Sequence, residues 1–126
     1  MILVDTSVWV DHLRRGGPEL VALLDRGSVL VHPWVVGELA LGDLRDRDEV
    51  LSLLGGLPQA TMATDDEVLA LIEQESLHGT GIGYVDAQLL AAARLTPGAA
   101  LWTRDRSLAQ AATRLGSGFD PDQGSG

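Results

Sequence analysis

Short apolar runs alternate with longer segments of helical pattern, and this alternation restricts the fold more than any other feature of the sequence. The runs expected to form strands are residues 2–4, 28–31, 60–63 and 99–103, and the patterns between them are too long for hairpin turns. Strands joined through helices lie parallel, and a parallel sheet is covered on both faces. The sequence therefore predicts an α/β fold with a mostly parallel central sheet of about four to five strands and helices on both faces.

The helical patterns have recognisable start and stop signals. Together with the expected strands, they account for the whole chain except its C-terminal end. Thr64 and Glu67 have the spacing of a capping box, and Pro18 stands at the first position of a helical pattern. The expected helices cover about residues 6–15, 18–26, 33–41, 46–54, 64–78, 84–95 and 107–115. Without an internal repeat or a low-complexity linker, residues 1–118 are expected to form one domain and residues 119–126 a flexible C-terminal tail.

Composition excludes several kinds of active site. The 126 residues include no cysteine, which excludes disulfides, thiolate metal sites and a cysteine nucleophile. They include no lysine either, which excludes Schiff bases, a Walker A phosphate site and the phospho-aspartate site of a receiver module. A net charge of -9 argues against nucleic-acid binding through a broad basic face, so a polyanionic substrate must be held locally.

The sequence also carries no signal for export or membrane insertion. No apolar stretch is long enough to cross a membrane, and the first residues lack the basic and apolar regions of a secretory signal. Asparagine is absent, so no glycosylation acceptor exists. These features predict a cytoplasmic protein with no membrane partner.

Four of the 18 acidic residues stand where a solvated carboxylate is not expected. Asp5 directly follows the first apolar run and Asp105 closely follows the last, so both lie at carboxyl ends of strands, where open α/β sheets bind ligands. Glu38 interrupts a helical pattern that is apolar on almost every side, and Asp86 shares an inward-facing stripe with the leucines after it. Each acid alone is equally well explained as a helix cap or as one half of a buried ion pair.

Taken together, the four carboxylates point to a metal site. In one cleft they would repel one another more than capping could offset, unless a hard divalent cation neutralised them. A site made only of oxygen ligands favours Mg²⁺ or Mn²⁺, which commonly serves phosphoryl chemistry by activating water. The residues therefore predict a metal held by Asp5, Asp86 and Asp105, with Glu38 as a ligand or as the group that orients the attacking water.

Three segments add a recognisable pattern to these acids: Ile-Leu-Val-Asp-Thr-Ser at 2–7, Gly-Ile-Gly-Tyr-Val-Asp-Ala at 81–87, and Thr-Arg-Asp at 103–105. With Glu38, they make the chain resemble PIN-domain ribonucleases over essentially residues 1–118, and more narrowly the VapC-type toxins of type II toxin–antitoxin systems. The resemblance implies a single PIN-like domain. It places the family's metal-binding acids at Asp5, Glu38, Asp86 and Asp105, with Thr6 and Thr103 as their hydroxyl neighbours.

The resemblance also implies an activity and partners. These are endonucleolytic cleavage of RNA, a homodimer, and a cognate antitoxin that covers the toxin and blocks its site. Ser107 stands where family members often carry another acid or amide, which leaves the number of metal ions open. Arg104 lies between two site residues and its guanidinium matches a phosphate, so it is a candidate substrate contact, with a solvated turn arginine as the equal alternative.

Two other functions are compatible with the same residues, namely a structure-specific DNA nuclease and a catalytically idle PIN-like binding module. No residue identifies a reader of the 2′-hydroxyl, although the short chain favours the toxin. Trp102 is expected in the core. The expected anchors for a partner or a second copy of the chain are Trp9, Leu13, Trp34 and Val35.

Overall fold

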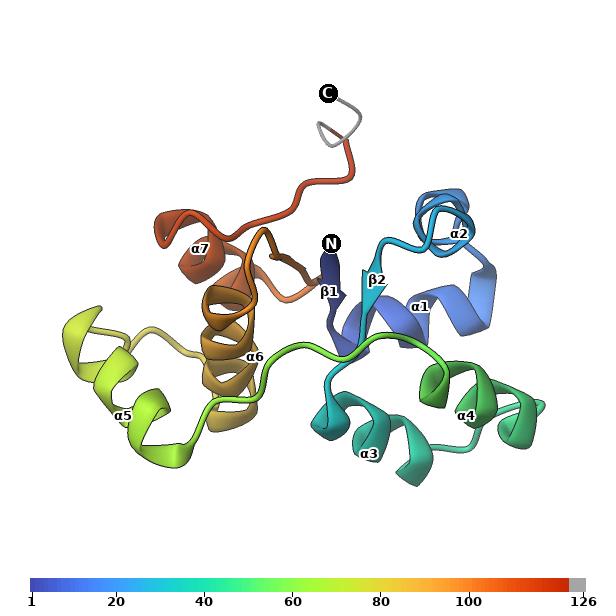
Figure 1. Ribbon diagram of the computed structural model, residues 1–126, viewed down its shortest axis with the longest axis horizontal. Coiled ribbons are helices and arrows are strands. Elements are labelled where there is room, and N and C mark those ends of the chain that lie inside the picture. The colour runs from blue at the N-terminus through green and yellow to red at the C-terminus, as the bar shows by residue number, and fades with distance from the viewer. Residues whose placement is uncertain (123–126) are drawn as a thin grey trace.

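The computed structural model describes residues 1–122 and alternates strands with helices (Figure 1). The strands are β1 (Ile2–Val4), β2 (Val29–Leu30) and β3 (Ala100–Trp102). The helices are α1 (Thr6–Arg15), α2 (Pro18–Asp25), α3 (Pro33–Leu41), α4 (Arg47–Gly55), α5 (Asp65–Gln74), α6 (Tyr84–Leu95) and α7 (Arg106–Arg114). The α/β class expected from the sequence is confirmed. Among these residues no helix has the length and apolar character that a membrane span requires.

The sheet is parallel throughout, and β1 is its central strand in the order β2-β1-β3. Leu3 pairs with Leu30 on one side and with Leu101 on the other. In Figure 1, α1 to α4 lie to one side of the strands and α5 to α7 lie to the other. Because β1 is central, the residue that follows it, Asp5, lies at the middle of the carboxyl edge of the sheet.

The sheet is narrower than expected, with three strands instead of four to five in the described residues. Segment 60–63 is not a strand; the residue before it, Gln59, forms a single parallel bridge with Val31. The ladder ends there because Pro33, which has no N–H to donate, begins α3 two residues after Val31. The backbone N–H of Thr61 donates instead to Oγ1 of Thr96 at 2.9 Å. The opposite edge ends in one bridge between Leu101 and Gly118.

Helix α6 connects α5 to the sheet. Its residues from Ala87 to Ala93 are all buried, and the helix packs against both α5 and β3. The small alanine side chains allow this close approach. Asp86 immediately precedes the buried stretch, so the packing of α6 determines where this carboxylate lies.

Helix α5 begins as expected and ends earlier. Oγ1 of Thr64 accepts from the Glu67 N–H at 3.1 Å, and Oε1 of Glu67 accepts from the Thr64 N–H at 2.9 Å, which confirms the capping box. The expected helix to residue 78 is wrong, because Ser76 adopts a left-handed φ of 52°. The N–H of the buried Leu77 then donates to the Ile72 carbonyl at 3.0 Å and closes the helix end.

Two of the four expected partner anchors are core residues instead. Trp9 is 1% exposed and Val35 is 0% exposed, so neither can anchor a partner. Trp9 lies one helical turn after the buried Asp5, on the face of α1 that points inward. Leu13 remains exposed and Trp34 is half-buried. Trp102 is in the core, as expected.

The segment expected as a tail begins with a residue that contacts the domain. The ring of Phe119 lies 5.5 Å from that of Trp102, and its N–H donates to the Leu101 carbonyl at 2.9 Å. Residues 123–126 of that expected tail lie outside the described residues.

Candidate active site

Asp5 is held at the carboxyl end of the central strand by its backbone and its side chain. Its N–H donates to the Trp102 carbonyl at 2.9 Å and continues the pairing of β1 with β3. Its Oδ1 accepts from the Thr6 N–H at 2.8 Å and caps α1. The side chain is therefore fixed where the strand passes into the helix, and the residue is only 7% exposed.

The second carboxylate oxygen of Asp5 accepts from two hydroxyl groups. Oγ of Ser7 donates to Oδ2 at 2.8 Å, and Oγ1 of Thr103 donates to it at 2.7 Å. The same hydroxyls receive the N–H groups of Arg104 and Asp105, each at 3.0 Å. Asp5 is thus joined to the turn after β3, and the carboxyl ends of two neighbouring strands are held together.

Ser7 is a site residue that the sequence analysis did not identify. It appeared there only as the last residue of the segment 2–7, whereas in the structure Asp5 caps α1 and Ser7 binds the Asp5 carboxylate. The available signal was a hydroxyl two residues after Asp5. Within the first turn of a helix, that spacing lets the side chain reach back to the capping carboxylate.

Asp86 and Asp105 each use one oxygen to cap a helix. Oδ2 of Asp86 accepts from the Gly83 N–H at 3.1 Å at the start of α6, and Oδ1 of Asp105 accepts from the Leu108 N–H at 2.9 Å at the start of α7. The other oxygen of each carboxylate makes no hydrogen bond within residues 1–122. Capping and ligand binding are therefore compatible, because a carboxylate has two oxygens.

Glu38 is exposed, although the apolar pattern of its helix suggested an inward position. Only Val35 and Leu39 of α3 are buried, while Leu41 is 91% exposed, so α3 covers the core with one face. The Glu38 face is open to solvent. Its Oε1 accepts from Oγ1 of Thr6 at 2.7 Å, which links α3 to the start of α1 beside Asp5.

Electrostatics shows that the four carboxylates occupy one region. Burial raises the pKa of Asp86, the Gly83 N–H lowers it, and the charges of Asp5, Asp105 and Glu38 raise it further. Across the described part of the chain, the ion pairs join Asp11 to Arg15 and Arg104, and Glu75 to Arg94. None of the four carboxylates has a cationic partner there, so their repulsion is not offset.

Arg104, the candidate phosphate contact, lies beside this cluster. Its Nη2 lies 3.3 Å from Oδ2 of Asp11, and its guanidinium lies 5.5 Å from the centre of the Trp102 ring. About half of its side chain is exposed, so the guanidinium is accessible to a ligand.

The order of these residues along the chain matches a known family. A family model described as a PIN domain matches residues 2–114. The chain belongs to the PIN-domain family. The resemblance expected from the sequence is confirmed, and so is the assignment of the fold to this class.

Relatives of this PIN domain include a named ribonuclease. This chain is 50% identical over 116 residues to Ribonuclease VapC32 from Mycobacterium tuberculosis, in strains CDC 1551 and H37Rv. The match covers 92% of this chain and 94% of the relative. Among solved structures, FitAcB from Neisseria gonorrhoeae matches with a TM-score of 0.63 and 26% identity, covering 98% of this chain and 99% of that one. The narrower VapC-type resemblance is thereby confirmed.

The acids of this PIN domain fit a hard divalent cation by their chemistry. They supply only oxygen, they lack cationic partners within residues 1–122, and Oε2 of Glu38 has no hydrogen bond there, like the free oxygens of Asp86 and Asp105. In the same part of the chain no three Asp, Glu or His side chains already converge as metal ligands.

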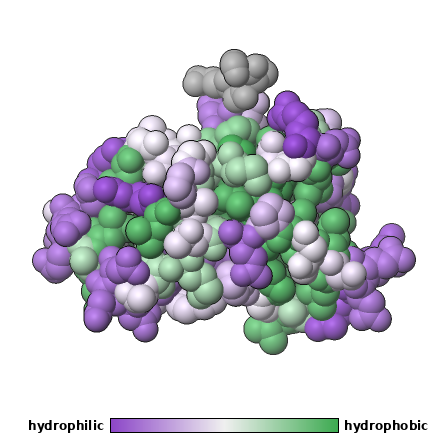
Figure 2. Space-filling model, viewed as in Figure 1, coloured by the Kyte–Doolittle hydropathy of each residue, from purple (hydrophilic) through white to green (hydrophobic). Residues whose placement is uncertain are grey.

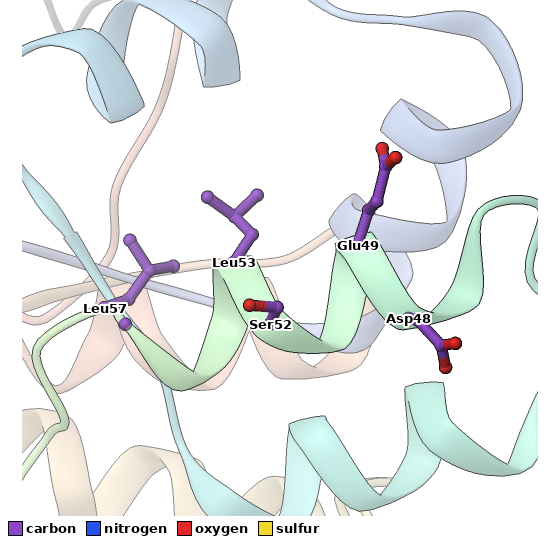
Figure 3. A pocket seen from close by; sticks show the side chains of 6 residues that line it. Asp48, Glu49, Ser52, Leu53 and Leu57 are labelled. Atoms are coloured by element: carbon purple, nitrogen blue, oxygen red, sulfur yellow. The ribbon is translucent and has the colours of Figure 1, made fainter.

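A depression elsewhere on the PIN domain does not share this chemistry. It lies along α4 and is open to solvent (Figure 3). None of the four acids contributes to it. Its lining residues are Asp48, Glu49, Ser52, Leu53, Gly56 and Leu57.

Proposed function

We propose that this PIN domain is the RNA-cleaving toxin of a toxin–antitoxin pair, with Asp5, Glu38, Asp86 and Asp105 as its catalytic residues. The observation that carries the proposal is that the charges of Asp5, Glu38 and Asp105 act on Asp86 at the carboxyl edge of the sheet, while none of the four forms an ion pair within residues 1–122. Such an arrangement costs stability unless a bound cation compensates it. The 50% identity to a protein named a ribonuclease supports RNA as the substrate.

Asp5, Asp86 and Asp105 are proposed to hold Mg²⁺ or Mn²⁺. A divalent ion bound there supplies positive charge for the phosphate and makes water more acidic. Asp5 is the rigid member of the set, because both of its oxygens are already fixed by hydrogen bonds. Asp86 and Asp105 supply oxygens that are not committed to capping.

Glu38 is proposed to orient and deprotonate the attacking water. The Thr6 hydroxyl donates to Oε1 of Glu38 and so restrains the carboxylate. The other oxygen, Oε2, remains able to accept a proton. Glu38 is exposed, so water reaches it freely. Thr6 and Thr103 position carboxylates, since Thr6 contacts Glu38 and Thr103 contacts Asp5.

Arg104 is proposed to bind a substrate phosphate. A guanidinium group can donate two parallel hydrogen bonds to a phosphate. In the free protein the Arg104 guanidinium pairs with an anion already, through one contact of 3.3 Å to the Asp11 carboxylate. Its backbone N–H contacts Ser7, so the residue is anchored one hydrogen bond away from the Asp5 network.

A protein partner is proposed to cover the same site. A basic side chain of the antitoxin, inserted among the carboxylates, would replace the charge of the cation and exclude it. On the face drawn in Figure 2, hydrophobic side chains reach the surface between hydrophilic margins, which suits an antitoxin or a second copy of the chain. The exposed apolar side chains include Leu13, Val21, Leu41 and Leu53. Sedimentation is expected to show a homodimer, and the product of a neighbouring gene is expected to co-purify and suppress cleavage.

Cleavage of labelled single-stranded RNA tests the function, with DNA of the same sequence as the second substrate. The wild type is expected to cleave RNA when Mg²⁺ or Mn²⁺ is present and to stop when a chelator is added. Asp25→Asn removes the same charge from an exposed position outside the site and should cleave normally. Cleavage of DNA alone would assign a DNA nuclease, and no cleavage of either would leave a binding module.

A further inference from the structure

One part of the surface is basic, although the chain as a whole is acidic. A depression between α1 and the turn after β3 contains arginines, although the protein as a whole has a net charge of -9. Three of the nine basic residues line it, against one carboxylate. The lining residues are Ser7, Val10, Asp11, Arg14, Arg15 and Arg104.

The depression begins at the catalytic carboxylates. Oγ of Ser7 donates to Asp5 at 2.8 Å and accepts from the Arg104 N–H at 3.0 Å, so one side chain belongs both to the depression and to the Asp5 network. Arg14 follows Ser7 by two helical turns on the same face of α1. At a rise of about 1.5 Å per residue, it lies roughly 10 Å farther along the helix axis.

We infer that this basic depression, defined by Arg14, Arg15 and Arg104, binds the phosphodiester backbone of the RNA strand next to the scissile phosphate. The inference rests on the proposed function. Guanidinium groups bind phosphates in a bidentate manner, and their charge attracts a polyanion that the remaining acidic surface repels. A strand that leaves the carboxylates along α1 meets these groups in succession.

The three guanidinium groups are accessible in the free protein. The Arg15 side chain is 80% exposed and that of Arg104 is 49% exposed. Arg14 is exposed as well, and within residues 1–122 it makes no ion pair. The arginines are therefore available to a ligand without unfolding any part of the domain.

Asp11 restrains two of the arginines. Its carboxylate lies 3.4 Å from Arg15 and 3.3 Å from Arg104, so it offsets part of their charge and competes with an incoming phosphate. Exposed ion pairs of this kind add little to folding stability. Removal of the Asp11 charge should therefore strengthen RNA binding, whereas removal of the arginines should weaken it.

RNA binding and cleavage kinetics of the full chain test the inference. The binding probe is a short 5′-fluorescein single-stranded RNA, followed by fluorescence anisotropy with a chelator present and over a range of salt concentrations. The variants are Arg14→Gln with Arg15→Gln, and Asp11→Asn. The matched control is Arg26→Gln with Arg114→Gln, which removes two exposed charges away from Arg14 and from the depression.

The expected results differ in sign between the variants. The Arg14/Arg15 double variant should bind RNA several-fold more weakly, and its plot of log affinity against log salt should lose about 0.7 in slope for each lost phosphate contact. In Mg²⁺ its KM should rise while kcat stays near that of the wild type, because neither residue touches the reacting atoms. Asp11→Asn should bind more tightly, and the Arg26/Arg114 variant should keep the wild-type slope.

The outcomes separate this inference from the proposed function. Equal RNA affinity and KM in the Arg14/Arg15 and Arg26/Arg114 variants would overturn the inference, while RNA cleavage by the wild type would still support the function. The same equality, together with loss of the co-purifying partner from the Arg14/Arg15 variant, would assign the depression to an acidic protein segment and also overturn it. Weaker RNA binding by the Arg14/Arg15 variant of a chain that cleaves no RNA would support the inference and remove the function.

Discussion

The Thr103 hydroxyl donates to Oδ2 of Asp5 at 2.7 Å, a contact between residues 98 positions apart in the sequence. Thr103 also accepts the Asp105 N–H at 3.0 Å, so one hydroxyl links two of the proposed catalytic acids. The rigidity of the site thus depends on a side chain that carries no charge.

Thr103→Val tests this link. The change removes the hydroxyl at nearly constant volume and leaves the Asp105 N–H without its acceptor. We expect the free energy of unfolding to fall by about 1–3 kcal/mol and cleavage to decrease, because Asp5 loses one of its restraints. Denaturant unfolding and RNA cleavage measure the two effects. Thr103→Ser keeps the hydroxyl and should retain most of both properties; an equal loss in the serine variant would assign the effect to packing.

Asp86→Asn should stabilise the protein when divalent ions are absent. The pKa of Asp86 is raised in the folded protein by burial and by the neighbouring carboxylates, so its ionised form opposes folding. This penalty is present above the raised pKa and disappears as the pH falls below the unfolded value of about 4. The variant should therefore unfold at higher denaturant concentration near neutral pH and match the wild type in acid. A less stable variant at neutral pH would contradict the repulsion described here.

The same variant should lose RNA cleavage while it remains folded. Asparagine keeps an oxygen for the Gly83 N–H and so preserves the cap of α6, but it removes the charge proposed to bind a cation. Asp25→Asn serves as the control. Unchanged cleavage by Asp86→Asn would remove Asp86 from the catalytic set.

Mg²⁺ or Mn²⁺ should raise the melting temperature of the wild type. A ligand that binds only the folded state stabilises it by about 1.4 kcal/mol at ten times its dissociation constant. Asp86→Asn should reduce this shift, and Asp25→Asn should not. Equal shifts in all three proteins would show that the cation binds away from the carboxylates.

Acid should destabilise the protein through His32. This residue is 0% exposed, its Nδ1 accepts the Trp34 N–H at 3.1 Å at the start of α3, and burial lowers its pKa. As the pH falls below about 6.5, the unfolded chain gains a proton that folded His32 does not bind, so the free energy of unfolding decreases.

His32→Asn keeps a capping acceptor and should lose this part of the pH dependence. The control His78→Asn changes an exposed histidine and should behave as the wild type. Denaturant unfolding at several pH values measures the difference. An unchanged pH dependence in His32→Asn would mean that another group is responsible.

Several elements could be predicted from the sequence because their causes are local. The alternation of strands and helices, the capping box of Thr64 and Glu67, and the position of Asp5 after β1 all depend on residues within one or two turns of each other. The confirmed PIN-domain resemblance depends on short segments of the same kind. Periodicity and capping chemistry are therefore sufficient for the class of fold and for the carboxylates at the carboxyl ends of β1 and β3.

Only the tertiary structure decided which faces of the elements are covered. The patterns of α1 and α3 did not distinguish Trp9 and Val35, which are buried, from Glu38, which is exposed, because both helices carry more apolar residues than the core can cover. The width of the sheet likewise depended on a contact between distant segments, the pairing of Val31 with Gln59, which ends where Pro33 begins α3. The sequence by itself determined the local elements and the kinds of side chain at the site. The contacts between distant residues, whose free energies depend on the folded neighbours, decided burial, sheet width and the joining of Ser7 and Thr103 to Asp5.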